Sequence, residues 1–513
     1  MESPESPAGF LHQGHPGRLA GRLVTWLAAC TIVLQPLLAP AQEGVQLPDL
    51  GGSGAVLPPA EAKTFPTDFR NFMRQEGLLV DDPVIDSYFT EMGYQLVMHS
   101  DGRTRNFHFH VLKIPGINAF AAPAGVVALN AGLVLAADSA DEVAGVLAHE
   151  ISHVTQNHLL RGMQEQQRVS LPVMLATLGL VMAGSVAGGM DAETAQGILA
   201  AGSGLSQQTQ INYTRQNEAE ADRIGIQLLA RAGYDPTGMA DFFNTLNRWA
   251  RSQGAGPPEY LRTHPLTVGR VAEARERARQ YRKRPTPSDE RFDLVQARLR
   301  VVMADHPDQA VRHFTQRLRS ENGSEMANRY GLALAYIEAR RTGRAEDHLS
   351  WLLQQDENNQ LFRILNAEYL LAKDRTSEAL DEFHRLHLAY GHSTLVALAY
   401  ADALLKSERQ EDAEQAVEIL LKQQRRNPDD TRISEMLARA ADRAGDPVRA
   451  AEAVATNYYQ RGGLSQAIEQ LQRVLDRDDL DYYARARISA RLDQMRVERL
   501  RTMDDSPQAN QGR

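Results

Sequence analysis

Cysteine is almost absent from this sequence, because Cys30 is the only one among 513 residues. Cys30 also lies in an N-terminal segment that we expect to be removed, so the mature chain would contain no cysteine. This composition excludes a cysteine-ligated metal site and a thiol nucleophile. A metal ion would have to be bound by histidine and carboxylate side chains.

Clustered positive charge is also lacking. The 56 Lys and Arg residues are outnumbered by 65 Asp and Glu residues, the formal net charge is −9 and the pI is about 6.0. No basic block stands out, so we do not expect a nucleic acid partner.

The N-terminus has the pattern of an export signal. Arg18 and Arg22 precede an apolar run at residues 23–38, and small residues at 39–41 provide a cleavage site. The run is shorter than the roughly 20 residues that a membrane helix needs. We therefore expect cleavage after Ala41. The alternative is a lipoprotein with lipid on Cys30, which is weaker because the residues after Cys30 stay apolar.

Composition and periodicity divide the chain into five segments. Residues 1–41 form the signal, and residues 42–66, rich in proline and glycine, form an extended lead-in. Residues 67–285 have a mixed pattern of helices and strands, whereas residues 286–500 are helical in pattern throughout. Residues 501–513 are polar and predicted to be disordered. The fold class is therefore an α+β domain followed by an all-α region.

Residues 107–111 and 125–129 have the alternation of strands. We expect His108 and His110 to lie on the strand surface, as lone histidines usually do. We also expect residues 126–129 to form an exposed strand edge, where an extended peptide can pair through its main chain with little side-chain demand.

A helix with a defined start carries the most specific motif. Ser139 fits an N-cap, and Glu142 fits the position that reaches back toward it. The helix continues to about residue 160 and contains His-Glu-Ile-Ser-His at 149–153. Two histidines four apart lie about 40° apart around the helix axis, so both imidazoles can reach one ion. Glu150 lies at the edge of that face, where it can hold a water beside the metal.

A third ligand is expected downstream, because catalytic zinc sites use three protein ligands and one open position. Glu218 and Asp222 share a helical face, so Glu218 can bind the metal and Asp222 can accept the free N–H of a ligand histidine. Glu220 is rotated by about 200° from Glu218 and is expected to face solvent. His158 lies about 180° from His149 on the helix, so we do not expect it to be a ligand. Other acidic residues are closer in sequence but lie in less patterned surroundings: Glu165, Asp191 and Glu193.

Residues 171–190 contain no charged side chain and reach the length of a membrane helix, about 20 residues. Pro172 and four glycines interrupt the stretch, which favours a buried or mobile helical hairpin near the active site. Contact with a membrane surface and a true membrane span are the alternatives.

His264 is a further candidate, in Thr-His-Pro at 263–265. Pro265 biases His264 toward an extended backbone, which suits a side chain presented from a loop. His264 could occupy the fourth position of the metal as a latch that keeps the site latent until a substrate arrives. The alternative is a loop histidine that packs against the domain or helps to bind substrate.

The helical region shows a 34-residue repeat. Ala345, Ala379 and Ala413 are spaced 34 residues apart, and each begins a helix that follows another helix. This period is typical of tetratricopeptide repeats, with small residues where neighbouring helices cross. Ala450 and Ala467 mark candidate degenerate units. An irregular helical bundle is the alternative.

These motifs together resemble a known family. His-Glu-x-x-His at 149–153, followed by Glu-x-x-Ala-Asp at 218–222, is the pattern of the gluzincin metallopeptidases (family 48) related to HtpX-type proteases and CAAX prenyl endopeptidases. Asn-Ala-Phe-Ala at 118–121 and Thr-His-Pro at 263–265 are similar to that family as well. Ala-Pro-Ala-Gly at 122–125 departs from it, because the family usually has two adjacent glycines there, and this leaves the local turn open.

The resemblance implies a zincin-like metallopeptidase fold with one Zn²⁺ per subunit. It implies His149, His153 and Glu218 as the zinc ligands. It also implies Glu150 as the catalytic base and Asp222 as a supporting residue or proton donor.

Together with an export signal and a repeat tail, the resemblance implies a zinc-dependent endopeptidase with chaperone-like activity in the periplasm. The implied substrates are unfolded or misassembled outer-membrane β-barrel proteins, and the repeats would contact the β-barrel assembly machinery. The alternative is a repeat-based assembly adaptor or chaperone with little proteolysis. The intact Glu150 favours the protease, because a purely structural zinc needs no base between its ligands.

Overall fold

The computed structural model describes residues 59–100, 106–158, 207–253, 258–281, 289–407, 409–428, 430–460, 463–478 and 480–504. Several predicted features lie outside these residues: the signal, Cys30 and the uncharged stretch at 171–190. Within the described residues, no helix combines the length and the apolar character that a membrane crossing requires.

The first part of the chain contains a three-stranded sheet. β1 (His108–Leu112) pairs in parallel with β3 (Val126–Asn130), and β2 (Ala119–Ala122) pairs antiparallel with the other side of β3. The strand order is β1-β3-β2, so β3 is the central strand. The prediction that residues 126–129 form an exposed edge is therefore wrong, because the preceding Asn-Ala-Phe-Ala segment forms a strand and covers that edge. Among the described residues, β1 and β2 are the two edge strands of this sheet.

The turn between β2 and β3 is the 3₁₀ helix η1 (Pro123–Gly125). Ala124 and Gly125 both have positive φ, +56° and +78°. A Cβ on Gly125 would lie 2.0 Å from the Asn106 carbonyl oxygen. Glycine is thus required at 125. Ala124, in the turn where the family usually has two adjacent glycines, adopts the left-handed conformation although it is not a glycine.

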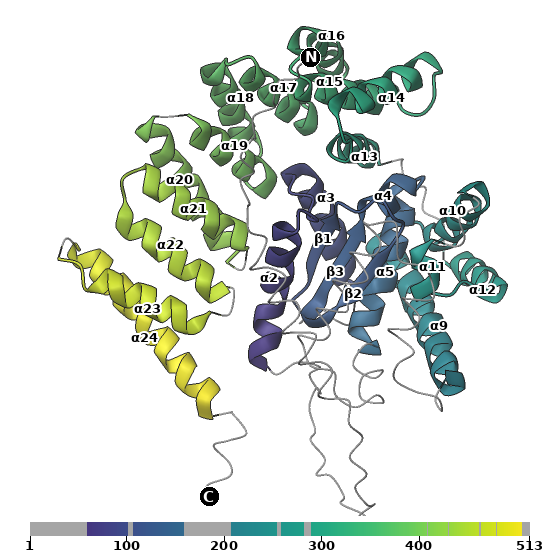
Figure 1. Cartoon of the computed structure of the whole chain (residues 1–513), viewed down its shortest axis with the longest axis horizontal. Helices are drawn as coiled ribbons and strands as arrows, with labels where there is room; N and C mark the ends of the chain where they lie inside the picture. The colour runs from purple at the N-terminus through teal and green to yellow at the C-terminus, as the bar shows by residue number, and fades with distance from the viewer. Residues whose placement is uncertain are drawn as a thin grey trace, which may run out of the picture. The chain divides into compact units, whose positions relative to one another are not determined.

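Helices cover both faces of the sheet (Figure 1). α2 (Pro59–Gln75) packs on one face through Phe65 and Phe69, and α3 (Pro83–Val97) and α5 (Ala140–Thr155) pack on the other. α2 begins inside the stretch at 42–66 that was expected to be extended, because proline is tolerated at the first position of a helix. His110 faces α2 and is buried, so the expected surface position is also wrong.

The described residues of this part also form α4 (Ala131–Ala136), α9 (Gln207–Ala232), α10 (Gly238–Gln253) and α12 (Val268–Arg279), with the short α11 (Glu259–Thr263) before α12. Two glycines allow α9 and α10 to approach α5 closely. A Cβ on Gly145 of α5 would lie 2.8 Å from the Met239 backbone of α10, and one on Gly225 of α9 would lie 3.2 Å from the His149 nitrogen. Backbone-to-backbone contacts therefore fix the position of α5 relative to α9 and α10.

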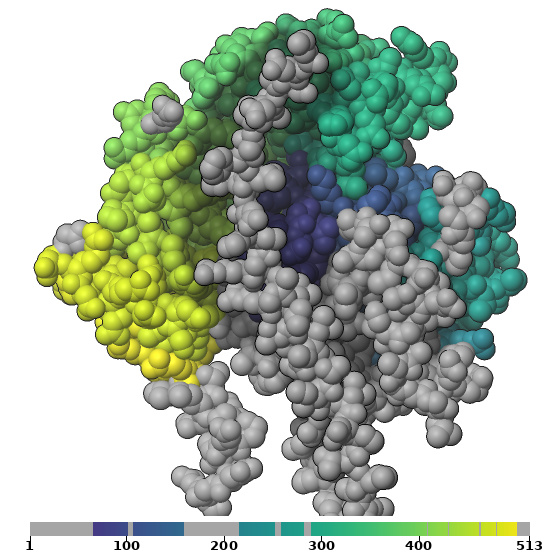
Figure 2. All heavy atoms as spheres, viewed as in Figure 1, coloured from purple at the N-terminus to yellow at the C-terminus, as the bar shows by residue number. Residues whose placement is uncertain are grey.

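From residue 289 onward every described element is a helix. These helices are α13 (Glu290–Val302), α14 (Pro307–Arg319), α15 (Glu325–Glu338), α16 (Thr342–Gln355), α17 (Gln360–Ala372), α18 (Thr376–Ala389), α19 (Thr394–Lys406), α20 (Gln410–Arg426), α21 (Thr431–Arg443), α22 (Pro447–Gln460), α23 (Leu464–Leu475) and α24 (Tyr482–Asp504). The surface formed by the last part of the chain runs from green to yellow in Figure 2. α24 extends four residues into the tail that was expected to be disordered from residue 501.

The 34-residue period is visible in the packing. Ala345, Ala379 and Ala413 lie in the first turns of α16, α18 and α20, and each is at most 1 % exposed. The turns before α16 and α18 repeat as well, because Arg340 and Asp374 both have φ of +57°. Small buried residues at the helix crossings agree with the tetratricopeptide prediction.

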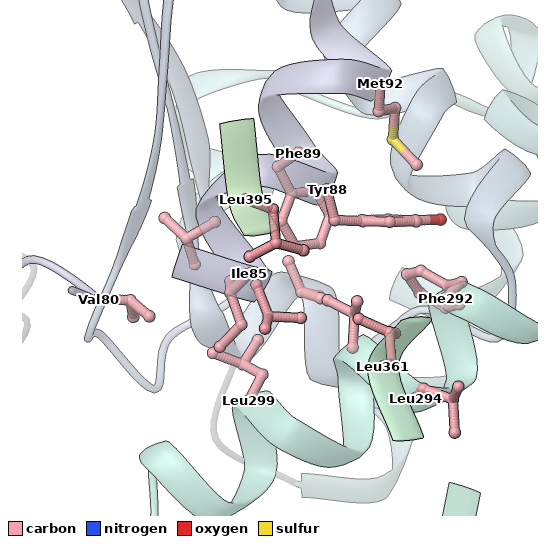
Figure 3. Close-up of a cluster of buried hydrophobic side chains, with 14 of the residues drawn as sticks. Val80, Ile85, Tyr88, Phe89, Met92, Phe292, Leu294, Leu299, Leu361 and Leu395 are labelled. Atoms are coloured by element: carbon pink, nitrogen blue, oxygen red, sulfur yellow. The ribbon is translucent and has the colours of Figure 1, made fainter. Parts of the chain in front are cut away.

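The two parts share one hydrophobic core. Ile85 and Tyr88 of α3 gather with Phe292 of α13, Leu361 of α17 and Leu395 of α19 (Figure 3). All described residues belong to one compact unit.

A buried ion-pair network joins the same helices. Arg298 of α13 lies 2.7 Å from Asp82, the N-cap of α3, and 2.7 Å from Glu368 of α17. Arg298 is buried, so both carboxylates compensate its charge inside the core.

Candidate metal centre

The start of α5 is fixed by its cap. Ser139 Oγ accepts a hydrogen bond from the Glu142 N–H at 3.3 Å, as the sequence predicted. Glu142 reaches back to the Asp138 N–H at 3.0 Å, one residue before the N-cap. The Glu142 carboxylate also accepts a hydrogen bond from Thr245 Oγ1 of α10, and burial raises its pKa to about 7. The cap therefore ties α5 to α10 as well as to its own first turn.

Four side chains from three segments converge on one point. His149 and His153 come from α5, Glu218 from α9 and His264 from the residue that follows α11. The potential ligand atoms all lie within 4.8 Å of one another. The sequence predicted each of the four, and the structure brings them together.

The spacing of these atoms suits a tetrahedral ion. His149 Nε2 lies 3.0 Å from His153 Nε2, 3.3 Å from His264 Nδ1 and 3.4 Å from Glu218 Oε2. Glu218 Oε1 lies 3.4 Å from His153 Nε2 and 3.0 Å from His264 Nδ1. Ligands about 2.0–2.2 Å from a tetrahedral zinc are about 3.3–3.6 Å apart. The cluster therefore fits zinc with little adjustment, and its nitrogen and oxygen donors are those that zinc accepts.

His149 has a second partner on its other ring nitrogen. Its Nδ1 lies 3.0 Å from Asp222 Oδ1. A carboxylate in this position fixes the tautomer of a ligand histidine and keeps Nε2 free for the metal. Asp222 lies one turn beyond Glu218 on α9, which explains how one helix supplies both groups.

Arg270 of α12 anchors both carboxylates, and sequence reasoning missed it. Its guanidinium donates two hydrogen bonds to Asp222, at 2.7 and 2.8 Å, and its Nη1 lies 3.0 Å from Glu218 Oε2. Nη1 also donates to the Pro265 carbonyl oxygen at 2.9 Å, beside His264. The available signal was weak, because one arginine five residues after Thr-His-Pro is not distinctive in a helix rich in arginine.

Charge and burial together shape the cluster. Burial alone would lower the pKa of His149, but Asp222 and Glu218 raise that pKa to about 10. Burial lowers the pKa of His153 to about 3. Burial alone would raise the pKa of Glu218, but His264, His149 and His153 hold it well below its usual range. Zinc binds the deprotonated forms of these side chains, so metal ions and protons compete for the same nitrogen and oxygen atoms.

Glu150 is placed beside the cluster rather than in it. Its side chain is 1 % exposed, and its Oε1 lies 3.6 Å from His264 Nε2. Within the described residues that oxygen has no hydrogen-bond partner. Burial raises the pKa of Glu150, and the Ala121 backbone of β2 donates a hydrogen bond to it. The predicted base therefore lies between the metal ligands and the edge strand.

His158 and Glu220 were not expected near the site, yet both contact its periphery. His158 Nδ1 lies 3.0 Å from His153 Nδ1, and His158 Nε2 lies 3.1 Å from Glu220 Oε2. The expectation that Glu220 faces solvent is only partly met, because its side chain is 31 % exposed. The other acidic alternatives at 165, 191 and 193 lie outside the described residues.

The chain matches peptidase family M48 over residues 86–278 and a tetratricopeptide repeat family over residues 398–456. It belongs to the M48 metallopeptidases, which are zinc-dependent. The predicted family, fold class, protease activity and zinc cofactor are thereby confirmed.

Relatives of similar length carry a more specific name. The β-barrel assembly-enhancing protease of Escherichia coli (strain K12) is 34 % identical over 485 residues, covering 93 % of this chain and 97 % of the relative. The protein of that name from Yersinia pestis is 33 % identical over 90 % of this chain and 93 % of its own length. The mitochondrial metalloendopeptidase OMA1 of Bos taurus is 31 % identical, but over only 31 % of this chain and 30 % of its own.

Proposed function

We propose that this metalloprotease is a periplasmic endopeptidase with chaperone-like activity, which cleaves unfolded or misassembled outer-membrane β-barrel proteins. The observation that carries the catalytic part is the position of Glu150, a buried carboxylate with one unpartnered oxygen between the ligand cluster and the edge strand β2. The names of the two relatives of similar length support the substrate class.

His149, His153 and Glu218 would hold the zinc. When bound, the ion supplies Lewis acidity that polarises the scissile carbonyl and makes water easier to deprotonate. Asp222 keeps His149 in the tautomer that presents Nε2, and Arg270 holds Asp222 and Glu218 in place through the contacts described above.

Glu150 acts as general base and then as general acid. Its carboxylate takes a proton from the attacking water and returns it to the nitrogen of the leaving amine. A carboxylate whose pKa is raised by burial suits both steps, because it holds the proton long enough to pass it on.

An extended substrate pairs with β2. Phe120 and Ala121 are partly exposed on this strand, while its other side is occupied by β3. Main-chain pairing needs no particular side chains, so it suits an enzyme that acts on unfolded chains. The hydrogen bond from Ala121 to Glu150 keeps the strand and the base in register.

His264 would act as a latch by providing a fourth ligand to the zinc. Its Nδ1 lies 3.3 Å from His149 Nε2 and 3.0 Å from Glu218 Oε1. These separations are close to those expected between two ligands of one zinc ion. Replacing His264 with alanine should raise casein cleavage without loss of zinc. A lower rate at unchanged zinc content would instead assign His264 to substrate or transition-state binding.

The N-terminal signal, cleaved after Ala41, delivers the protein to the periplasm, with lipidation at Cys30 as the alternative. The repeat helices α13 to α24 contact the β-barrel assembly machinery. For residues 171–190, contact with the membrane surface is the alternative to the helical hairpin favoured by their sequence. The mass of the mature N-terminus distinguishes signal cleavage from lipidation.

Zinc analysis beside casein cleavage tests the catalytic proposal. Glu150→Gln should keep zinc and the fold but lose hydrolysis, because only the base is removed. His149→Ala and Glu218→Gln should lose zinc as well. Full activity in Glu150→Gln would contradict the mechanism.

A repeat-based adaptor or chaperone with little proteolysis is the second candidate, and the length of the helical array favours it. Wild-type protein that suppresses aggregation of an unfolded β-barrel protein without cleaving casein would support this candidate. Loss of aggregation suppression in Glu150→Gln would count against it.

A further inference from the structure

His158 and Glu220 make contacts at the metal centre that the proposed catalytic mechanism does not use. His158 is 5 % exposed and lies between His153 and Glu220, with nitrogen-to-nitrogen and nitrogen-to-oxygen distances of 3.0 and 3.1 Å. His158 therefore occupies, for one ligand histidine, the position that Asp222 occupies for the other.

A left-handed residue places His158 there. α5 ends at Thr155, and Asn157 has φ of +55°. On a continued helix His158 would lie about 140° around the axis from His153 and point away from it. After the left-handed Asn157, the His158 ring instead contacts His153. Asparagine tolerates this conformation better than most residues.

The ring contacts define a proton arrangement. His153 Nε2 faces the other ligand atoms, so Nε2 must be free of hydrogen for metal binding and Nδ1 must carry it. His153 Nδ1–H then donates to His158 Nδ1. A neutral His158 that accepts at Nδ1 carries its hydrogen on Nε2, which donates to Glu220 Oε2. Each ring nitrogen of His153 and His158 thus acts either as a donor or as an acceptor, with no conflict between neighbours.

We propose that His158 and Glu220 are positioning residues, a relay that fixes the tautomer and orientation of His153 for zinc. The two ligand histidines are then oriented in different ways, His149 by the buried Asp222–Arg270 pair and His153 by a histidine backed by a partly exposed glutamate. The inference rests on the proposed function, because it requires His153 to bind zinc through Nε2.

The test measures the zinc dissociation constant by competition with a chelator, and the visible absorption spectrum of the Co²⁺-substituted protein. His158→Leu removes both contacts and should weaken zinc binding 10–100-fold, the usual effect of losing an orienting partner. His158→Asn keeps an acceptor at the position of Nδ1 and should recover most of the affinity. Glu220→Leu should weaken binding in the same direction.

Two matched comparisons separate positioning from general destabilisation. Arg223 contacts the other oxygen of Glu220 at 3.8 Å and is half exposed, so Arg223→Ala is a control that should leave zinc affinity unchanged. Asn157→Gly preserves the left-handed turn, whereas Asn157→Val opposes it, since a β-branched residue is strained at positive φ. Zinc affinity should therefore survive the glycine variant and fall in the valine variant.

Each outcome decides the inference. Wild-type zinc affinity and an unchanged Co²⁺ spectrum in folded His158→Leu would overturn the relay. If that variant does not fold, the same result in Glu220→Leu overturns it. Failure of wild-type protein to bind zinc would refute the proposed function itself. Reduced affinity in His158→Leu, Glu220→Leu and Asn157→Val, with recovery in His158→Asn, supports the relay.

Discussion

The buried His110 makes the stability of this protein depend on pH. Its ring stacks on Phe69 at 5.8 Å, and within the described residues neither ring nitrogen has a hydrogen-bond partner. Burial holds the pKa of His110 well below 6.5, and the positive charges of Arg70, His108 and Arg74 act in the same direction. Because the folded state resists the proton that the unfolded chain accepts, stability is present above pH 6.5 and is lost as the pH falls below it.

The size of this effect follows from the pKa of the unfolded chain. At pH 5 an unfolded histidine with a pKa of 6.5 is stabilised by protonation by about 2 kcal/mol, at 1.36 kcal/mol for each pH unit. His110→Leu removes this term and fills a similar volume. Between pH 7 and pH 5, the free energy of unfolding of the wild type should therefore fall by about 2 kcal/mol more than that of His110→Leu. At pH 7 the variant should be at least as stable, because it buries no unpartnered nitrogen.

Urea unfolding followed by circular dichroism at both pH values measures this difference. All other titrating groups are shared, so the comparison isolates position 110. His392 is exposed, and His392→Leu serves as the control for replacing a histidine at a solvated position. Equal loss of stability on acidification in wild type and His110→Leu would refute the reasoning.

Three further substitutions test the packing. Ala379→Trp should destabilise the array by about 1–3 kcal/mol or more in urea unfolding, because Ala379 is 0 % exposed, and an unchanged midpoint would argue against a helix crossing there. Gly145→Ala should lower the melting temperature and casein cleavage, since its Cβ would lie 2.8 Å from Met239 backbone atoms, whereas Gly343→Ala, with nothing within 4 Å, should do neither. Arg270→Met should cost about 3–5 kcal/mol by leaving Asp222 buried without its cation, and a wild-type melting temperature would show that the pair is dispensable.

The ligand set could be predicted from sequence because it depends on short spacings. Two histidines four apart on a capped helix need no tertiary information to share a face, and the same holds for Glu218 and Asp222. The repeat period is equally local, since every unit obeys the same helix-turn-helix rule.

Predictions failed where a distant or irregular element decides the outcome. His110 is buried because α2 covers its side of the sheet, and β3 is central because β2 pairs beside it. His158 reaches His153 through one left-handed residue, which helical periodicity does not represent. Arg270 acts on Asp222 from 48 residues away, across the packing of α9 and α12.

The shared core of Figure 3 has a consequence for the order of folding. Asp82 and Arg298, joined in the folded protein, are 216 residues apart, and Arg432 pairs with Asp86 across 346 residues. Contacts of such long range form late, because the entropy of closing the loop must be overcome before they contribute. α3, which also supports the sheet beside α5, therefore lacks its final partners until the repeat helices have been synthesised and have docked. A chain that emerges from its N-terminus cannot complete its apolar core first, so active enzyme should accumulate only after the helices up to α21 are in place.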